Sequence, residues 1–134
     1  MVKILVVDDE PTIRRLLRLT LGPGHDVEEA EDGRVALQKM ARTVPDIVLL
    51  DIAMPNLDGL AVCRAVRADP TLRAVGIIVI SAHANRGEAL DAGADLYLQK
   101  PFRPLELLKA IDDVLNARGS GTDERRKGPQ PASS

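Results

Sequence analysis

Short apolar runs alternate with amphipathic segments along most of this chain. Apolar runs bounded by turn residues are typical of strands buried on both faces of a parallel sheet. The run from His25 to Ala30 is more polar, which places its strand at or near an edge of the sheet. The pattern predicts strands at Val2–Val7, His25–Ala30, Ile47–Leu50, Gly76–Ile80 and Leu96–Leu98.

The segments between these runs carry apolar residues at helical spacing. In the first, Ile13, Leu16 and Leu17 recur on one side and Arg14, Arg15 and Arg18 lie on the outer side. Helices are expected at Pro11–Leu21, from Gly33 to Met40, at Gly59–Ala68, at Glu88–Ala92 and at Leu105–Leu115. Strands that alternate with helices indicate an α/β fold, in which helices cover both faces of a parallel sheet.

Residues 119–134 have a different composition. Gly, Ser and Pro are mixed with charged residues there, and no apolar periodicity remains. Such a segment cannot bury enough surface to order itself. We therefore expect one domain at residues 1–118, followed by a disordered C-terminal tail or linker whose basic residues serve solvation rather than binding.

Composition excludes several classes of protein. The 134 residues have a net charge of −2 and no basic stripe in the expected domain, which argues against direct nucleic-acid binding. The first apolar run is too short for a signal sequence or a membrane span. The single cysteine, Cys63, cannot form an internal disulfide, and we expect a cytoplasmic protein with Cys63 in its core. Tyr97 and Phe102 are the only aromatic residues, so the core should be aliphatic.

The most informative stretch is residues 47–58, where a short apolar run ends in Asp51. In open α/β sheets ligands bind beyond the carboxyl ends of the strands, so Asp51 is a candidate functional residue. The alternative is that Asp51 caps a helix, but Met54 and Pro55 disfavour a helix that starts there.

Other expected strands also end in chemically useful side chains: Asp8 and Asp9, Ser81, and Lys100. Parallel strands bring these ends to one edge, where each close pair of carboxylates would cost about 4 kcal/mol at an effective dielectric constant of 20. A hard divalent cation such as Mg²⁺ relieves that repulsion. A carboxylate nucleophile with a metal, a lysine and a hydroxyl suits phosphoryl transfer. The alternative is that these are unrelated caps and surface charges.

The chain resembles the receiver domains of bacterial two-component response regulators over roughly residues 1–118. Four segments carry the resemblance: Ile-Leu-Val-Val-Asp-Asp-Glu-Pro, Leu-Leu-Asp-Ile-Ala-Met-Pro-Asn-Leu-Asp-Gly, Ile-Ile-Val-Ile-Ser-Ala-His-Ala and Ala-Gly-Ala-Asp-Leu-Tyr-Leu-Gln-Lys-Pro-Phe. The resemblance implies a doubly wound, CheY-like (βα)5 flavodoxin-like fold, with a five-stranded parallel sheet in the order 2-1-3-4-5.

The resemblance also implies a role for each matching residue. Asp51 would accept a phosphoryl group from a sensor histidine kinase or phosphotransfer protein. Mg²⁺, or Mn²⁺ in its place, would be held by Asp8, Asp9, Asp51 and the main-chain carbonyl of Ala53. Lys100 would pair with the phosphoryl group, Ser81 would be the switch hydroxyl, and Tyr97 the aromatic residue that moves with it, although Tyr97 could also be only a strand residue. The Lys100–Pro101 peptide bond is expected to be cis.

Two features depart from the family pattern. Ala53 stands where many relatives carry a polar residue, and it and His83 are candidates for setting the phosphoryl lifetime. The segment from Ser81 to Lys100 is about one helical turn short, and Asn85, Arg86 and Gly87 leave little room for the fourth helix.

The sequence is therefore interpreted as a phosphorylatable signalling switch rather than a turnover enzyme. Its expected partners are a kinase and an unidentified output protein or domain, and a second copy of the chain is a candidate for phosphorylation-dependent dimerisation. The alternatives are a receiver-like scaffold that is not phosphorylated, or a receiver excised from a longer regulator. A phosphatase of the aspartyl-phosphate type would need a second acid at Ala53, and a flavodoxin-type electron carrier would not place Asp8 and Asp9 beside a phosphate.

Overall fold

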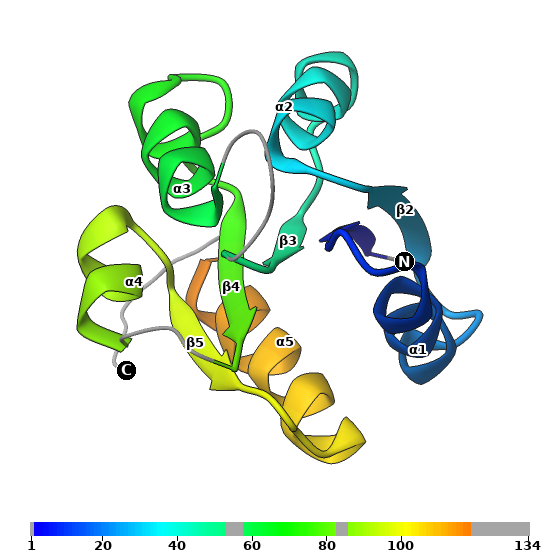
Figure 1. The fold of residues 1–134 in the computed structure, drawn as a ribbon. Coiled ribbons are helices and arrows are strands. Elements are labelled where there is room, and N and C mark those ends of the chain that lie inside the picture. The colour runs from blue at the N-terminus through cyan, green and yellow to red at the C-terminus, as the bar shows by residue number, and fades with distance from the viewer. Residues whose placement is uncertain (1, 53–57, 83–85, 119–134) are drawn as a thin grey trace.

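The computed structural model describes residues 2–52, 58–82 and 86–118, in which strands and helices alternate (Figure 1). The elements are β1 (Lys3–Val7), α1 (Pro11–Leu21), β2 (Asp26–Ala30), α2 (Gly33–Arg42), β3 (Ile47–Leu50), α3 (Gly59–Ala68), β4 (Gly76–Ser81), α4 (Arg86–Ala92), β5 (Leu96–Gln99) and α5 (Pro104–Arg118). The α/β fold expected from the sequence is confirmed, and element boundaries differ from the expected ones by at most three residues.

The five strands form one parallel sheet in the order β2-β1-β3-β4-β5. This is the flavodoxin-like order that the family resemblance implied. The polar strand β2 lies at an edge, as its sequence predicted, whereas the fully apolar strand β3 lies at the centre. Burial on both faces explains why β3 is a continuous apolar run.

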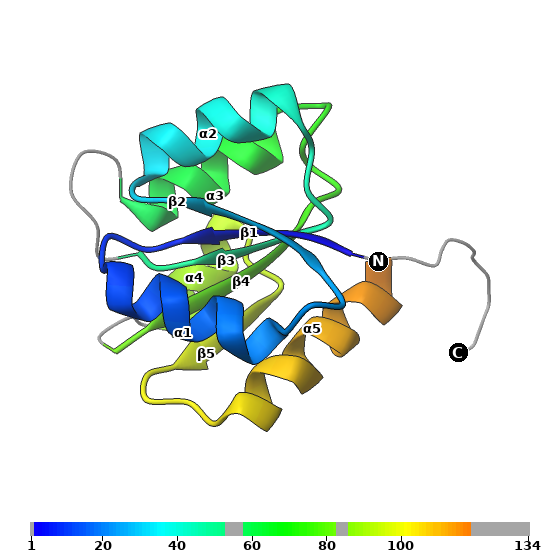
Figure 2. The same ribbon diagram turned by 90° about the vertical axis from the view of Figure 1, so that its right-hand side faces the viewer.

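Alternate residues of the strands point to opposite faces and build two cores. On β3, Val48 and Leu50 pack with α2, α3 and α4, whereas Ile47 and Leu49 pack with α1 and α5. Figure 2 shows α2 and α3 above the sheet and α1 and α5 below it. The fold is thus a helix–sheet–helix sandwich whose strand ends are left open at one edge for a site.

Both cores are aliphatic, as the scarcity of aromatic residues predicted. Tyr97 and Phe102 are only partly buried and pack against the edges of the two cores. Cys63 is fully buried, and burial raises the pKa of its thiol to about 11. Its predicted role as a small core residue is confirmed.

Helix α4 has more room than the sequence suggested. The helix starts at Arg86, so Arg86 and Gly87 belong to it and it extends over seven residues. Its buried residues, Ala89 and Ala92, are small, which lets the short helix lie close to the sheet. The shortened segment therefore keeps its fourth helix.

The predicted tail at residues 119–134 lies outside the described residues. Among the residues that the structure describes, no helix is long and apolar enough to cross a lipid bilayer.

Candidate functional site

The register of the central strands brings two aspartates together. Val7 of β1 pairs with Leu50 of β3, so the next residue of each strand, Asp8 and Asp51, leaves the sheet beside the other. Main-chain hydrogen bonds continue the ladder, because the Asp51 amide donates to the Val7 carbonyl at 3.0 Å. The convergence that the sequence predicted for these strand ends is confirmed.

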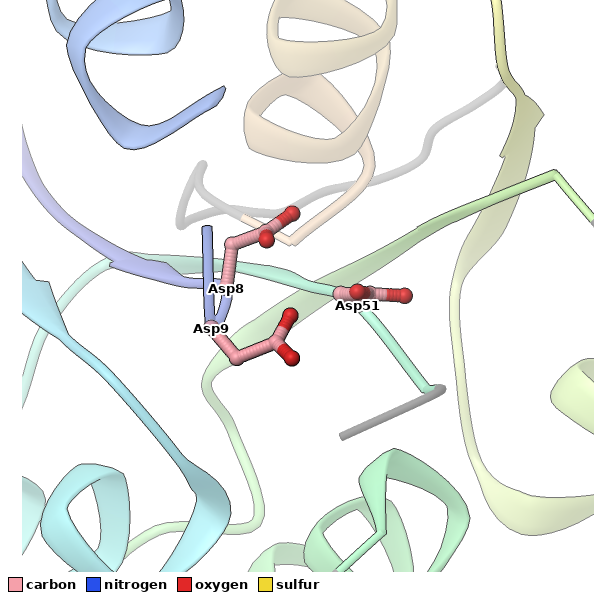
Figure 3. Close-up of side chains that lie close together, drawn as sticks. All are labelled: Asp8, Asp9 and Asp51. Atoms are coloured by element: carbon pink, nitrogen blue, oxygen red, sulfur yellow. The ribbon is translucent and has the colours of Figure 1, made fainter. Parts of the chain in front are cut away.

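Asp8, Asp9 and Asp51 gather their carboxyl groups in one small region (Figure 3). One carboxylate oxygen from each of the three lies within 4.8 Å of the others. Asp8 and Asp51 are 2% and 7% exposed, whereas Asp9 is open to solvent. This set of hard oxygen donors, buried at the base and open on one side, fits a divalent cation such as Mg²⁺ that keeps several water ligands.

A glycine lets the next helix approach the end of β3. A Cβ atom at Gly59, the first residue of α3, would lie 2.6 Å from the Asp51 carbonyl oxygen and 2.5 Å from the Cα of Ile52. Any side chain there would therefore push α3 away from the strand that carries Asp51. The side chain of Asp58 caps the same helix by accepting a hydrogen bond from the Ala61 amide at 2.9 Å.

Lys100 brings a positive charge to the acidic cluster from the end of β5. Its Nζ lies 3.1 Å from Asp8 Oδ2 and 3.8 Å from Asp51 Oδ2. The Lys100 side chain is 19% exposed, so solvent screens these ion pairs only in part. The structure thus joins residues that are 92 positions apart in sequence. The Lys100–Pro101 peptide bond is cis.

The main-chain carbonyl of Ser81 links Lys100 and Tyr97 by hydrogen bonds. The Ser81 carbonyl accepts hydrogen bonds from the Lys100 amide at 3.0 Å and from the Tyr97 hydroxyl at 3.1 Å. Ser81 is 2% exposed. The end of β4 is therefore tied both to the lysine of the site and to the aromatic residue on β5.

The other two residues singled out from the sequence, Ala53 and His83, lie outside the described residues. Their predicted influence on the site stays a prediction.

Arg14 has a role that the sequence analysis missed. It was assigned to the outer face of α1, but its side chain is only 17% exposed. Its guanidinium donates to the Asp8 carbonyl at 2.6 Å and to Glu29 of β2 at 3.0 Å. The helical pattern identifies the side of α1 on which Arg14 lies, but it does not show that β2 places an acid there.

Glu29 accepts from two arginines of α1. Arg18 Nε lies 2.7 Å from Glu29 Oε2, and Arg14 binds the other carboxylate oxygen. These hydrogen bonds, that of Arg18 first, hold the pKa of Glu29 below its usual range although burial acts in the opposite direction. The result is a charged link between α1, the edge strand and the turn that carries Asp8.

An apolar hollow of about 270 Å³ borders the site on the side of α1. It is lined by Ile13, Leu16, Ala82, Lys100, Pro101 and Phe102. Leu16, which the helical pattern places on the apolar side of α1, is instead 49% exposed. Another protein that approaches Lys100 from this side would meet an apolar surface.

The chemistry available at this edge is limited by its side chains. Buried carboxylate oxygens can bind a cation or act as a nucleophile, and a lysine ammonium can neutralise charge on a transferred group. These are the requirements for moving a phosphoryl group onto an aspartate.

Comparison with known proteins gives a consistent result. The family model described as "Response regulator receiver domain" matches residues 4–112. The chain is 50% identical over 118 residues to the response regulator MprA of Mycolicibacterium vanbaalenii, covering 85% of this chain and 50% of that protein. It is 43% identical over 117 residues to the transcriptional regulatory protein ResD of Bacillus subtilis, covering 84% of this chain and 48% of that protein.

Solved structures agree with this result. The chemotaxis protein CheY4 of Vibrio cholerae superposes with a TM-score of 0.80 at 35% identity, covering 86% of this chain and 99% of that one. The chain spans about half the length of the curated relatives it matches.

Proposed function

Because this chain belongs to the family of response regulator receiver domains, we propose that Asp51 accepts a phosphoryl group from a sensor histidine kinase or a phosphotransfer protein. One observation carries the proposal: the buried Asp51 carboxylate lies in a cluster with Asp8 and Asp9, and Lys100 Nζ is 3.8 Å away. If Asp51 were only a helix cap, the two neighbouring carboxylates and the lysine would have no explanation.

The proposed reaction is an in-line displacement at phosphorus. A carboxylate oxygen of Asp51 forms a new bond to the phosphorus atom while the bond between phosphorus and the donor's histidine nitrogen breaks. The electron pair of that bond returns to the imidazole, which can then take up a proton. The Lys100 ammonium, already beside Asp51, neutralises negative charge on the phosphoryl oxygens.

The acidic triad is typical of the Mg²⁺ site of receiver domains. We propose that Asp8, Asp9 and Asp51 hold Mg²⁺, with Mn²⁺ as a substitute, and that the main-chain carbonyl of Ala53 is a further ligand. When bound, the metal ion neutralises charge on the phosphoryl oxygens. Asp8 is held for this role by two contacts, since its Oδ1 accepts from the Glu10 amide at 2.9 Å and its carbonyl accepts from Arg14.

Phosphorylation would act as a switch by changing the relative stability of two conformations. We propose that the Ser81 hydroxyl binds the phosphoryl group and that Tyr97 moves with Ser81. The hydrogen bond from Tyr97 to the Ser81 carbonyl supports this coupling, because a shift of the Ser81 main chain would break or move it.

We also propose how the phosphoryl donor and the output partner contact this chain. The apolar hollow beside Lys100 supports contact with the phosphoryl donor, which must reach Asp51 from that edge of the sheet. The output would be a protein bound by this chain or a domain of a longer regulator, and a phosphorylation-dependent dimer is a further proposal. A cytoplasmic location stays a prediction based on the cysteine content.

The intact mass of the protein after incubation with acetyl phosphate tests the central proposal. We expect one phosphoryl adduct that requires Mg²⁺, forms in Asp112→Asn, and is absent in Asp51→Asn. Asp112 is a matched control because it is an exposed aspartate on α5. An adduct that persists in Asp51→Asn would refute the assignment of the phosphoacceptor.

The alternative function is a receiver-like scaffold that is not phosphorylated. It predicts neither an adduct with acetyl phosphate nor binding of beryllofluoride with Mg²⁺, an analogue of the phosphoryl group. Binding of beryllofluoride to the unsubstituted protein and not to Asp51→Asn would exclude it.

A further inference from the structure

Arg86 lies over the ring of Tyr97. Its guanidinium carbon is 5.8 Å from the ring centroid, within the range in which a cation is attracted to the face of an aromatic ring. Arg86 is the first residue of α4, and Tyr97 lies on β5, the edge strand beside it. The contact therefore joins the start of a helix to the edge of the sheet.

Tyr97 is held at its other end by the phosphoacceptor site. Its hydroxyl donates to the Ser81 carbonyl at 3.1 Å, and the same carbonyl accepts from the Lys100 amide. The ring is partly buried against the core formed with α2, α3 and α4. Tyr97 thus contacts Ser81 with its hydroxyl and Arg86 with the face of its ring.

The position of Arg86 in its helix is notable on electrostatic grounds. A positive charge at the first residue of a helix gains nothing from the helix dipole, which favours anions there. Arg86 is nevertheless exposed and directed over an aromatic face rather than away from the domain. The residue that starts α4 is thus also the one that reaches Tyr97.

We propose that Arg86 is a positioning residue which holds the Tyr97 ring in place and keeps its hydroxyl on the Ser81 carbonyl. The proposal deepens the switch function and rests on it. Loss of the cation would free the ring and favour the conformation in which Tyr97 has left Ser81. At an exposed site, one such contact corresponds to about a two- to fivefold change in the equilibrium between the two conformations.

The amino-acid composition allows the environment of Tyr97 to be measured by fluorescence. Tyr97 is the only tyrosine and the chain has no tryptophan, so the intrinsic fluorescence reports on Tyr97 alone. Quenching of this fluorescence by acrylamide should be stronger in Arg86→Ala than in the unsubstituted protein, and intermediate in Arg86→Lys, which keeps a cation. It should be unchanged in Arg64→Ala, which removes the same charge from an exposed position on α3. Equal quenching in Arg86→Ala and the unsubstituted protein would overturn the proposal.

Affinity for beryllofluoride with Mg²⁺ then separates positioning from simple shielding of the ring. Because the ring contacts Ser81 of the site, Arg86→Ala should change the affinity for beryllofluoride about two- to fivefold relative to the unsubstituted protein, and Arg64→Ala should leave it unchanged. Stronger quenching with unchanged affinity would mean that Arg86 only covers the ring, which overturns the positioning role.

The two proposals fail in different ways. If the unsubstituted protein does not bind beryllofluoride, the phosphoacceptor function fails and Arg86 has no switch to position, whatever the quenching shows. If it binds but Arg86→Ala behaves like Arg64→Ala in both measurements, only the role of Arg86 is overturned.

Discussion

Lys100 Nζ lies 3.1 Å from Asp8 Oδ2 and 3.8 Å from Asp51 Oδ2, so one cation bridges the buried carboxylates of two neighbouring strands. In this arrangement the lysine occupies part of the electrostatic role that a metal ion would take. If the cluster binds Mg²⁺ as proposed, lysine and metal would compete for its negative charge until a phosphoryl group adds more.

The Lys100→Gln substitution should strengthen metal binding in the absence of a phosphoryl group. Two like unit charges about 4 Å apart repel by about 1 kcal/mol even at the dielectric constant of water, which corresponds to roughly fivefold in affinity. Electron paramagnetic resonance of free Mn²⁺ during a titration would measure it. Lys109→Gln is the matched control, because that lysine is exposed and pairs with Asp113 on α5. Weaker Mn²⁺ binding in Lys100→Gln would contradict the competition.

The Asp9→Asn substitution should have opposite effects on stability with and without metal. In the metal-free protein it removes repulsion from the acidic cluster, so the free energy of unfolding should rise by about 1 kcal/mol. With saturating Mg²⁺ the unsubstituted protein should gain more stability from binding than the variant. Thermal unfolding in a chelator and in Mg²⁺ would check this, with Asp112→Asn as the control. Equal stability of Asp9→Asn and the unsubstituted protein in both solutions would count against a shared metal site.

We predict that the side chain of Arg67 contributes strongly to the stability of the fold. It donates at 2.6–3.0 Å to the carbonyls of Gly93, Arg73 and Val75 and to the carboxylate of Asp95. These bonds tie α3 to the segments that precede β4 and β5. Arg67→Ala should lower the free energy of unfolding by about 3 kcal/mol, because half-buried acceptors lose a charged donor.

Denaturant unfolding of Arg67→Ala would measure that loss. The matched control is Arg64→Ala, an exposed arginine of the same helix, for which we expect a change within about 0.5 kcal/mol. Similar values for the two variants would show that the network around Arg67 contributes little.

The Glu29 carboxylate should make stability depend on pH in the acid range. Because the pKa of Glu29 is lower in the folded protein than in the unfolded chain, its contribution is present above the unfolded value, about 4.3. That contribution is lost as the pH falls through the folded pKa. The difference in melting temperature between the unsubstituted protein and Glu29→Gln should therefore be constant near neutral pH and shrink in acid. A difference that does not change with pH would assign the effect of the substitution to packing.

Much of the site could be predicted from the sequence because a parallel sheet brings its strand ends to one edge. Asp8, Asp51 and Lys100 were identified by their positions just after apolar runs, and the observed register brings them together. Helix α4 was harder, because the length of the segment from Ser81 to Lys100 alone did not reveal that Arg86 and Gly87 would join the helix.

The sequence by itself determined the elements and, at most positions, the side that is buried, because side-chain periodicity depends only on local backbone geometry. It did not determine which side chains meet across elements. That Arg14 reaches both Asp8 and Glu29, that Arg86 covers Tyr97, and that Lys100 bridges two aspartates depend on how the crossover helices pack on the sheet. Long charged side chains have many rotamers, and only the tertiary structure selects the rotamer in which the charged group contacts its partner.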